Sequence, residues 1–292
     1  MKVLVAYDGS ESAECAVVDL RRAGLPKDAE ILVVSVAAAD VTPTAGSDLP
    51  APAISQASKT DLYVGKALTE TVHKWIESNF PEWKSTSQVL VGSPVTAILE
   101  KTVSWRPDLI VVGSHGRSLA GSILLGSVSK KLTHESPCSV RVVRAASSAS
   151  KSVSHGTIRI LVGSDGSAGA KDVIRNITER AWPEDTEVYV VSVLEKPDDQ
   201  LRSRLTQAAE EFLGSLQRVG LKATSAIVEG DPKRVLVAEA DRWKANVIFL
   251  GARGLGRLGE ISLGSVSNSV LNHAHCVVEI VRRNDISSKS LS

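Results

Sequence analysis

Two glycine-rich segments of the 292-residue sequence have residue types and spacing that could do chemistry. They read GSHGRSLAGSILLGS over residues 113–127 and GARGLGRLGEISLGS over residues 251–265, with the shared spacing Gly-x2-Gly-x9-Gly-Ser. Each follows four apolar residues, 109–112 and 247–250, which are typical of a buried strand, and each leads into a helical pattern. Because a turn between a strand and a helix can direct backbone N–H groups at a phosphate, both segments are candidate phosphate-binding loops.

The first two glycines of each segment have separate expected roles. Gly113 and Gly251 end a strand, where the missing side chain lets another group approach the backbone. Gly116 and Gly254 fall where a tight turn needs a positive φ, which glycine adopts without steric cost.

The last Gly-Ser pair of each segment opens a helix. Gly126 and Ser127 stand at one helix start, and Gly264 and Ser265 at the other. A helix start presents unpaired N–H groups and a partial positive charge, so it can bind an anion. The alternative is that these residues only cap and pack the helices, as glycine and serine do in many α/β proteins.

Other nucleotide motifs do not explain these segments. Neither contains the Gly-Lys-Ser/Thr of a Walker A loop. Gly254-x-Gly256-x-x-Gly259 matches a dinucleotide fingerprint, but it does not follow the first strand of its half.

The chain is an internal duplication. Lys2–Ser10 aligns with Arg159–Ser167 at an offset of 157, whereas Gly113 aligns with Gly251 at an offset of 138. The extra residues of the first half lie in a loop-like stretch, Val41–Ala53. We therefore predict a first domain, a linker, a second domain and a tail, at residues 1–144, 145–157, 158–283 and 284–292.

Both halves show the same alternation of strands and helices. The expected strands are Val3–Ala6, Ile31–Val36, Thr86–Val91, 109–112 and Ser139–Val143, and in the second half Ile160–Val162, Val188–Val193, Ala223–Val228, 247–250 and Val277–Val281. The longest expected helices are about 59–79 and 201–219. This order predicts the α/β class, with a doubly wound, five-stranded parallel sheet in each half, a Rossmann-like arrangement. Ligands of such sheets bind at the carboxyl ends of the strands, at the switch point of the winding.

Composition excludes several function classes. The net charge is +1, so we expect no nucleic-acid partner, and no apolar run reaches the ~20 residues of a membrane span. The first residues lack a signal-peptide pattern, which predicts a cytoplasmic protein. The three cysteines, Cys15, Cys138 and Cys276, have no spacing of a disulfide framework or a zinc site.

On these segments the chain resembles the universal stress protein family in its tandem two-domain form. The resemblance rests on GlySerHisGlyArg…LeuGlySerValSer and GlyAlaArgGlyLeuGlyArg…LeuGlySerValSer, the AspGlySer turns and the ProCysSerVal strand entry. Members of this family that keep the glycine motif bind ATP, and members that lack it do not. The resemblance therefore implies two ATP sites, with or without Mg2+.

The resemblance also implies which residues contact the nucleotide. Asp8 and Asp165 would lie beside the adenosine, backbone groups of Val36 and Val193 would meet the adenine edge, and the glycine loops would line the ribose and phosphates. The loop residues are Gly113, Gly116, Gly126, Ser127 and Val128 in the first half, and Gly251, Gly254, Gly264, Ser265 and Val266 in the second. The alternative for the two aspartates is an Asx turn that caps the following helix. Ala6 and Tyr7 stand where the second half has Gly163 and Ser164, so the two sites are expected to differ in affinity.

We expect no catalytic residue and no resident metal site. Arg117, Arg253 and Arg257 lie near the loops, but no paired carboxylates accompany them. His115 has no counterpart in the second half, so we expect it to be a solvated loop histidine. His273 and His275 flank the last strand without a matching set in the first half.

The predicted function is thus a nucleotide-dependent regulator or sensor in stress adaptation, not an enzyme. Two alternatives stay open: an interaction scaffold that binds no nucleotide, and a slow ATPase.

Assembly is predicted from the last strand of each half. Ser139–Val143 and Val277–Val281 are apolar enough to pair with another strand edge. In the family this strand joins two domains about a two-fold axis, which implies a pseudo-dimer of the two halves within one chain. A homodimer of chains is a further expectation that the sequence leaves open.

Overall fold

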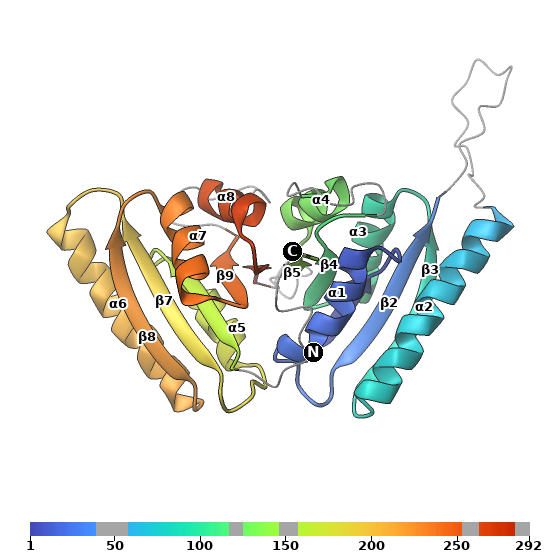
Figure 1. Cartoon of the computed structure of the whole chain (residues 1–292), viewed down its shortest axis with the longest axis horizontal. Helices are drawn as coiled ribbons and strands as arrows, with labels where there is room; N and C mark the ends of the chain where they lie inside the picture. Colours follow the sequence, from blue (N-terminus) through green and yellow to red (C-terminus); the bar gives the residue numbers. More distant parts are fainter. Residues whose placement is uncertain (39–57, 117–124, 146–156, 253–262, 284–292) are drawn as a thin grey trace, which may run out of the picture.

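The computed structural model describes residues 1–38, 58–116, 125–145, 157–252 and 263–283, and these form one continuous ten-stranded sheet with helices on both faces (Figure 1). The first half contains β1 Lys2–Ala6, α1 Glu11–Asp19, β2 Glu30–Ala37, α2 Lys59–Asn79, β3 Lys84–Val91, α3 Pro94–Trp105, β4 Leu109–Gly113, α4 Ser127–Glu135 and β5 Ser139–Val143. The second half contains β6 Arg159–Ser164, α5 Ala168–Thr178, β7 Glu187–Leu194, α6 Asp199–Arg218, β8 Lys222–Glu229, α7 Pro232–Trp243, β9 Val247–Gly251, α8 Ser265–His273 and β10 Val277–Val281. A short 3-10 turn, Leu20–Arg22, follows α1.

The strand order confirms the doubly wound topology of both halves. The sheet runs β3-β2-β1-β4-β5-β10-β9-β6-β7-β8, so each half has the same order from its outer edge to the centre. Strands within a half are parallel, and β5 and β10 are antiparallel. The winding reverses between β1 and β4, and between β6 and β9, which places the switch points of both halves.

The strands form where they do because both faces of the sheet are covered. One core layer packs α1, α2, α5 and α6 on the sheet, through residues such as Val17, Ile76, Ile174 and Phe212. The other packs α3, α4, α7 and α8, through residues such as Ile98, Leu132, Leu236 and Val270. Both layers contain residues of both halves, so the core is continuous across the β5–β10 junction.

Helix and strand limits follow local capping. α3 and α7 begin at Pro94 and Pro232, since proline lacks the N–H that a first helical residue cannot use. α6 begins at Asp199, two residues before the predicted start, because the Asp198 side chain accepts a hydrogen bond from the Leu201 N–H at 2.9 Å.

The predicted pairing of the two halves through their last strands is confirmed. Val142 lies opposite Val278, and Val140 opposite Ile280, in the antiparallel β5–β10 pair.

In the described part of the chain, no helix is long and apolar enough to cross a membrane.

Candidate functional site

A cavity opens at the carboxyl ends of the strands in each half, at the switch point of the winding. The cavity of the first half measures about 200 Å3 and that of the second about 530 Å3. All seven predicted residues of the first half line the first cavity: Asp8, Val36, Gly113, Gly116, Gly126, Ser127 and Val128. Six of the second half line the second cavity: Asp165, Val193, Gly251, Gly264, Ser265 and Val266. Gly254, like Arg117, Arg253 and Arg257, lies outside the described residues.

The helix that starts at each cavity lacks a side-chain cap among the described residues. Gly126 and Gly264 are the N-caps of α4 and α8, with nearly identical φ and ψ of −64° and 155°, and −62° and 154°. Among the other helices, α3 also lacks a side-chain cap, whereas side chains of Ser10, Ser58, Ser167, Asp198 and Asp231 cap α1, α2, α5, α6 and α7. The first N–H groups of α4 and α8 have no acceptor within the helix, and they carry the positive end of its dipole toward the cavity.

The amides of the two N-cap glycines are themselves occupied, contrary to the expectation that they face a ligand. The Gly126 N–H donates to the Ser114 carbonyl at 2.7 Å, and the Gly264 N–H donates to the Ala252 carbonyl at 2.8 Å. These bonds close the turn that orients the helix. The donors that remain for an anion are the next amides, those of Ser127 and Val128 and their counterparts Ser265 and Val266.

The prediction of a positive φ at Gly116 is wrong. The positive-φ glycines of the described chain include the matched pairs Gly9 and Gly166, and Gly92 and Gly230, but not Gly116. A Cβ at Gly116 would lie 3.1 Å from Asp8 Oδ2, so this glycine permits close approach of the Asp8 carboxylate.

Gly113 has a packing role as well as a place in the cavity wall. A Cβ at this position would lie 2.7 Å from the Ala13 nitrogen, so only glycine lets the start of α1 approach the end of β4.

Sequence reasoning missed several residues that line the sites, among them one serine in the first turn of each helix. The Ser129 hydroxyl donates to the Gly113 carbonyl at 2.6 Å, and the Ser267 hydroxyl donates to the Gly251 carbonyl at 2.8 Å. Each bond ties the first turn of α4 or α8 to the strand that precedes its glycine loop. The repeated Ser-Val-Ser after the last glycine was the available signal.

Asp8 and Asp165 form the Asx turns that were considered for them, and their place beside the adenosine stays a prediction. Asp8 Oδ1 accepts the Ser10 N–H at 3.0 Å, and Asp165 Oδ1 accepts the Ser167 N–H at 3.0 Å, which are the expected Asx turns. Both carboxylates also line the cavities.

Val36 and Val193 direct peptide groups into the cavities. The Val34 carbonyl accepts the Tyr7 N–H, so this residue of β2 faces β1. Val36 is two residues further along and faces the same side, but β1 ends at Ala6, opposite Val34. In the second half the Leu194 carbonyl accepts the Gly230 N–H, so Leu194 faces β8 and the preceding residue, Val193, faces β6. The paired part of β6 ends at Ser164, opposite Ser192, so the peptide groups of Val193 are also beyond the end of the neighbouring strand.

His115 is half-buried, whereas a solvated histidine was expected. It lines the first cavity, its Nδ1 lies 2.8 Å from Ser114 Oγ, and its Nε2 is buried without a hydrogen-bond partner in the described residues. Its carbonyl accepts the hydroxyls of Ser10, at 3.2 Å, and Ser12. Burial lowers the pKa of His115 below its ordinary value, and the Arg144 guanidinium lowers it further.

Other candidate groups take structural positions. His275 Nδ1 lies 3.1 Å from Asp241 Oδ2, and no group of three or more His, Cys, Asp or Glu in the described residues could hold a metal ion. Burial raises the pKa of the Cys138 thiol to about 11 and of Cys276 to about 12. These two thiols are therefore protonated and packed in the core.

Comparisons with known proteins assign the family. The sequence model of the universal stress protein family matches residues 1–144 and 157–282. A universal stress protein of Mycobacterium tuberculosis is 30% identical over 210 residues, which cover 68% of each chain. One from Thermus aquaticus is 32% identical over 142 residues, 49% of this chain and 97% of the relative. This chain belongs to the universal stress protein family.

A solved structure supports the same fold for the whole chain. A universal stress protein of Archaeoglobus fulgidus superposes with a TM-score of 0.64 at 23% identity, covering 97% of this chain and 98% of that one. Together with the two family matches, this likeness makes the chain a tandem universal stress protein with two Rossmann-like halves.

Proposed function

We propose that this chain binds ATP in both cavities and acts as a nucleotide-dependent regulator of stress adaptation in the cytoplasm. The observation that carries the proposal is the pair of helix starts, α4 and α8, that lack a side-chain cap and open on cavities at the switch points. Anions bind such helix starts through backbone N–H groups and the helix dipole. Each dipole contribution is only about 0.3–2 kcal/mol, so the hydroxyls and successive amides of one loop must act together.

The cavity walls suit the rest of an adenine nucleotide. Apolar side chains of Val34, Ile98 and Val112 line the first cavity, and Val191, Leu236 and Leu250 line the second, which gives a purine ring apolar faces. Peptide groups of Val36 and Val193 at the cavity walls support the proposal that they pair with the edge of the ring. The second cavity lies within the ~300–1,000 Å3 common for small-molecule sites, and the first is smaller.

A Mg2+ ion bound with the phosphates would take oxygen ligands. Asp8 and Asp165 are the carboxylates that the two cavities place at equivalent points.

We propose binding without turnover. In the described residues the first cavity wall contributes one carboxylate, Asp8, and one histidine, His115, and the second contributes the carboxylates of Asp165, Glu195 and Asp198 without a histidine to act as a base. Phosphoryl transfer needs a positioned nucleophile or base together with charge neutralisation at the γ-phosphate. Phosphate release from the purified protein well above the buffer background would instead favour the slow ATPase.

The scaffold alternative is favoured by one specific observation. The Gly126 and Gly264 amides already bond to Ser114 and Ala252, so a purely structural use of the glycine loops accounts for part of their geometry.

Unfolding in the presence of ATP separates the regulator from the scaffold. At a ligand concentration 100 times the dissociation constant, linkage predicts stabilisation of about 2.7 kcal/mol per saturated site that binds only the folded state. We expect the urea midpoint to rise with ATP concentration. An unchanged midpoint up to millimolar ATP would favour the scaffold.

A further inference from the structure

The two halves meet where equivalent positions of the repeat face each other. In the antiparallel β5–β10 pair, Arg141 lies directly opposite Glu279. The offset of 138 that aligns Gly113 with Gly251 also aligns these two residues. The pseudo-two-fold axis between the halves therefore passes between a basic and an acidic side chain at the same position of the fold.

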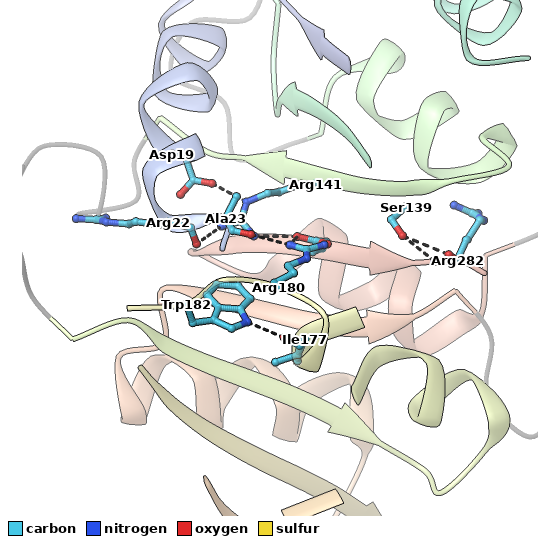
Figure 2. A network of polar contacts seen from close by, with 10 residues as sticks. Asp19, Arg22, Ala23, Ser139, Arg141, Ile177, Arg180, Trp182 and Arg282 are labelled. Atoms are coloured by element: carbon cyan, nitrogen blue, oxygen red, sulfur yellow. Dashed lines mark hydrogen bonds and ion pairs between the residues drawn. The ribbon is translucent and has the colours of Figure 1, made fainter. Parts of the chain in front are cut away.

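These two side chains are at the centre of a buried charge cluster, of which Figure 2 labels Arg141, Asp19 and Arg180. Arg141 and Glu279 are 1% and 0% exposed, and Arg141 Nη1 donates to Glu279 Oε2 at 2.9 Å. Arg141 Nε donates to Asp19 Oδ2 at 2.6 Å, and Arg180 Nη1 donates to Glu279 Oε2 at 3.2 Å. A second Arg180–Glu279 bond completes the pair. Burial on its own lowers the pKa of Arg141, but Asp19 and Glu279 raise it above its ordinary value, so the guanidinium is charged.

One matched pair of contacts at the junction obeys the pseudo-symmetry, unlike the bonds of the Ser139 hydroxyl to the Arg282 main chain, since Val277 stands at the position equivalent to Ser139. Arg144 Nη2 donates to the Leu271 carbonyl at 2.5 Å, and the equivalent Arg282 Nη2 donates to the equivalent Thr133 carbonyl at 2.6 Å. Each arginine thus binds the last turn of α8 or α4 in the opposite half. Contacts of this kind would form equally in a pair of two first halves or two second halves, so they cannot select a partner.

The charge cluster breaks the symmetry. The position equivalent to Asp19 holds Asn176, and the position equivalent to Arg180 holds Ala23. In the first half the acid, Asp19, is on the helix α1 and the base, Arg141, is on the last strand. In the second half the acid, Glu279, is on the last strand and the base, Arg180, follows the helix α5. Arg180 Nη1 also donates to the Ala23 carbonyl at 2.9 Å, beside the small side chain of its counterpart position.

We propose that this cluster determines which edge strands can pair: the β5 edge accepts a β10 edge and rejects a second β5 edge. In a β5–β5 pair, two Arg141 guanidinium groups would lie opposite each other in a buried site, and each would lose Glu279. A β10–β10 pair would place two Glu279 carboxylates together in the same way. Like charges that are buried and opposed cost free energy and so disfavour the wrong partner. The symmetric contacts strengthen the junction, and the cluster selects the partner.

Chains cut in the linker test the proposal. A protease site placed between residues 146 and 156 lets the folded chain be cut while both halves are present. Cut protein labelled with 15N is then mixed with unlabelled cut protein, brought to exchange equilibrium, and analysed by native mass spectrometry. We expect only pairs of one first half with one second half, in which both halves, one half or neither half carries the 15N label. Pairs of two first halves or two second halves in statistical proportion would overturn the proposal without any substitution.

An exchange of the cluster between the halves gives the sharper test. The triple substitution D19N/A23R/R141E gives the first half the charge set of the second, and we expect its pairing with the unchanged second half to weaken by at least tenfold. Adding N176D/R180A/E279R exchanges the second half as well, and we expect pairing to recover. Recovery also shows that both exchanged halves fold.

The matched control removes symmetric contacts. R144M/R282M should weaken the junction but leave only unlike halves paired. The proposal is wrong if the single exchanged half pairs with the unchanged second half as tightly as before. It is equally wrong if the fully exchanged chain, folded by circular dichroism, forms like pairs as readily as unlike ones.

Discussion

The main chain has the same conformation at the two cavities, but the side chains around it differ. The N-cap torsions of α4 and α8 agree within a few degrees, and Ser129 and Ser267 make the same bond to the preceding strand. Around the first cavity, Ser12 and Ser114 contact the main chain and ring of His115. The equivalent positions of the second half hold Gly169 and Ala252. Duplication has kept the path of the main chain, which would bind phosphates, and let the lining diverge.

Compensating exchanges accompany this divergence. Gly163 stands where the first half has Ala6, and a Cβ on Gly163 would lie 3.0 Å from Leu236 Cδ1 and closer still to Leu250. The first half has the smaller Val112 at the position of Leu250, so it can accommodate an alanine. In each half the size of this residue on the first strand is therefore matched to the size of the residue on the strand beside it in the sheet, β4 or β9.

The connection after the second strand is the other difference. In the second half, residues 195–198 join β7 to α6, and Glu195, Lys196 and Asp198 line the larger cavity. In the first half, residues 38–58 join β2 to α2, and most of them lie outside the described residues. Because the second cavity is also the larger, at about 530 Å3 against about 200 Å3 for the first, we expect the second site to bind nucleotide more tightly than the first.

The largest expected effect comes from filling one cavity with a bulky side chain, which should remove ATP binding at that site alone. In Val193→Trp the larger side chain would occupy the space next to the exposed peptide edge of β7. We expect ATP stoichiometry to fall from two per chain to one, with at least about a 100-fold loss at the second site, or about 2.7 kcal/mol. Isothermal titration calorimetry measures both quantities. Val36→Trp is the matched control and should remove only the first site; loss of both sites in either variant would contradict two independent cavities.

Exchange of the first-strand residue tests the packing difference. Gly163→Ala should lower the free energy of unfolding by about 1–3 kcal/mol, because the added methyl group overlaps Leu250 and Leu236. Adding Leu250→Val, which copies the first half, should recover most of the loss in urea unfolding. A double variant no more stable than Gly163→Ala would show that the two positions are not coupled.

Removal of the Ser129 or Ser267 hydroxyl tests the bond between helix and strand that both halves have in common. Ser129→Ala and Ser267→Ala each leave a strand-end carbonyl without its bond, at a cost of about 1 kcal/mol. We expect equal or larger effects for Ser129, which is 2% exposed against 7% for Ser267. Urea midpoints that stay at the wild-type value in both variants would contradict this role.

Acid should affect the first half through His115. Its folded-state pKa is lowered, so the neutral ring is favoured in the folded protein, and its stabilising contribution is complete above the ordinary pKa of 6.5. That contribution is lost as the pH falls below 6.5 toward the folded-state pKa. NMR titration of the ring should give a pKa under 6.5, and His115→Gln should reduce the loss of stability between about pH 7 and pH 5. A pKa at or above 6.5 would contradict the burial of the ring.

Sequence periodicity predicted the fold well because buried parallel strands are nearly continuous apolar runs. The limits of β5 and β10 were predicted to the residue, those of α2 agree with the approximate prediction, and the residues predicted for the sites come together wherever they are described. Details that depend on contacts between distant segments were not predictable. The close approach of Asp8 to Gly116, the bonds that occupy the Gly126 and Gly264 amides, and the burial of the His115 Nε2 atom all belong to this class.

The central claim is that the intact chain binds ATP at two sites, and native mass spectrometry of the wild-type protein with ATP measures this directly. The account predicts a series of masses that ends at two nucleotides per chain, with the first bound at a lower concentration than the second. Val193→Trp should remove the nucleotide that binds first. A spectrum without bound nucleotide at millimolar ATP, from protein that is folded and in which the two halves are paired, would contradict the account.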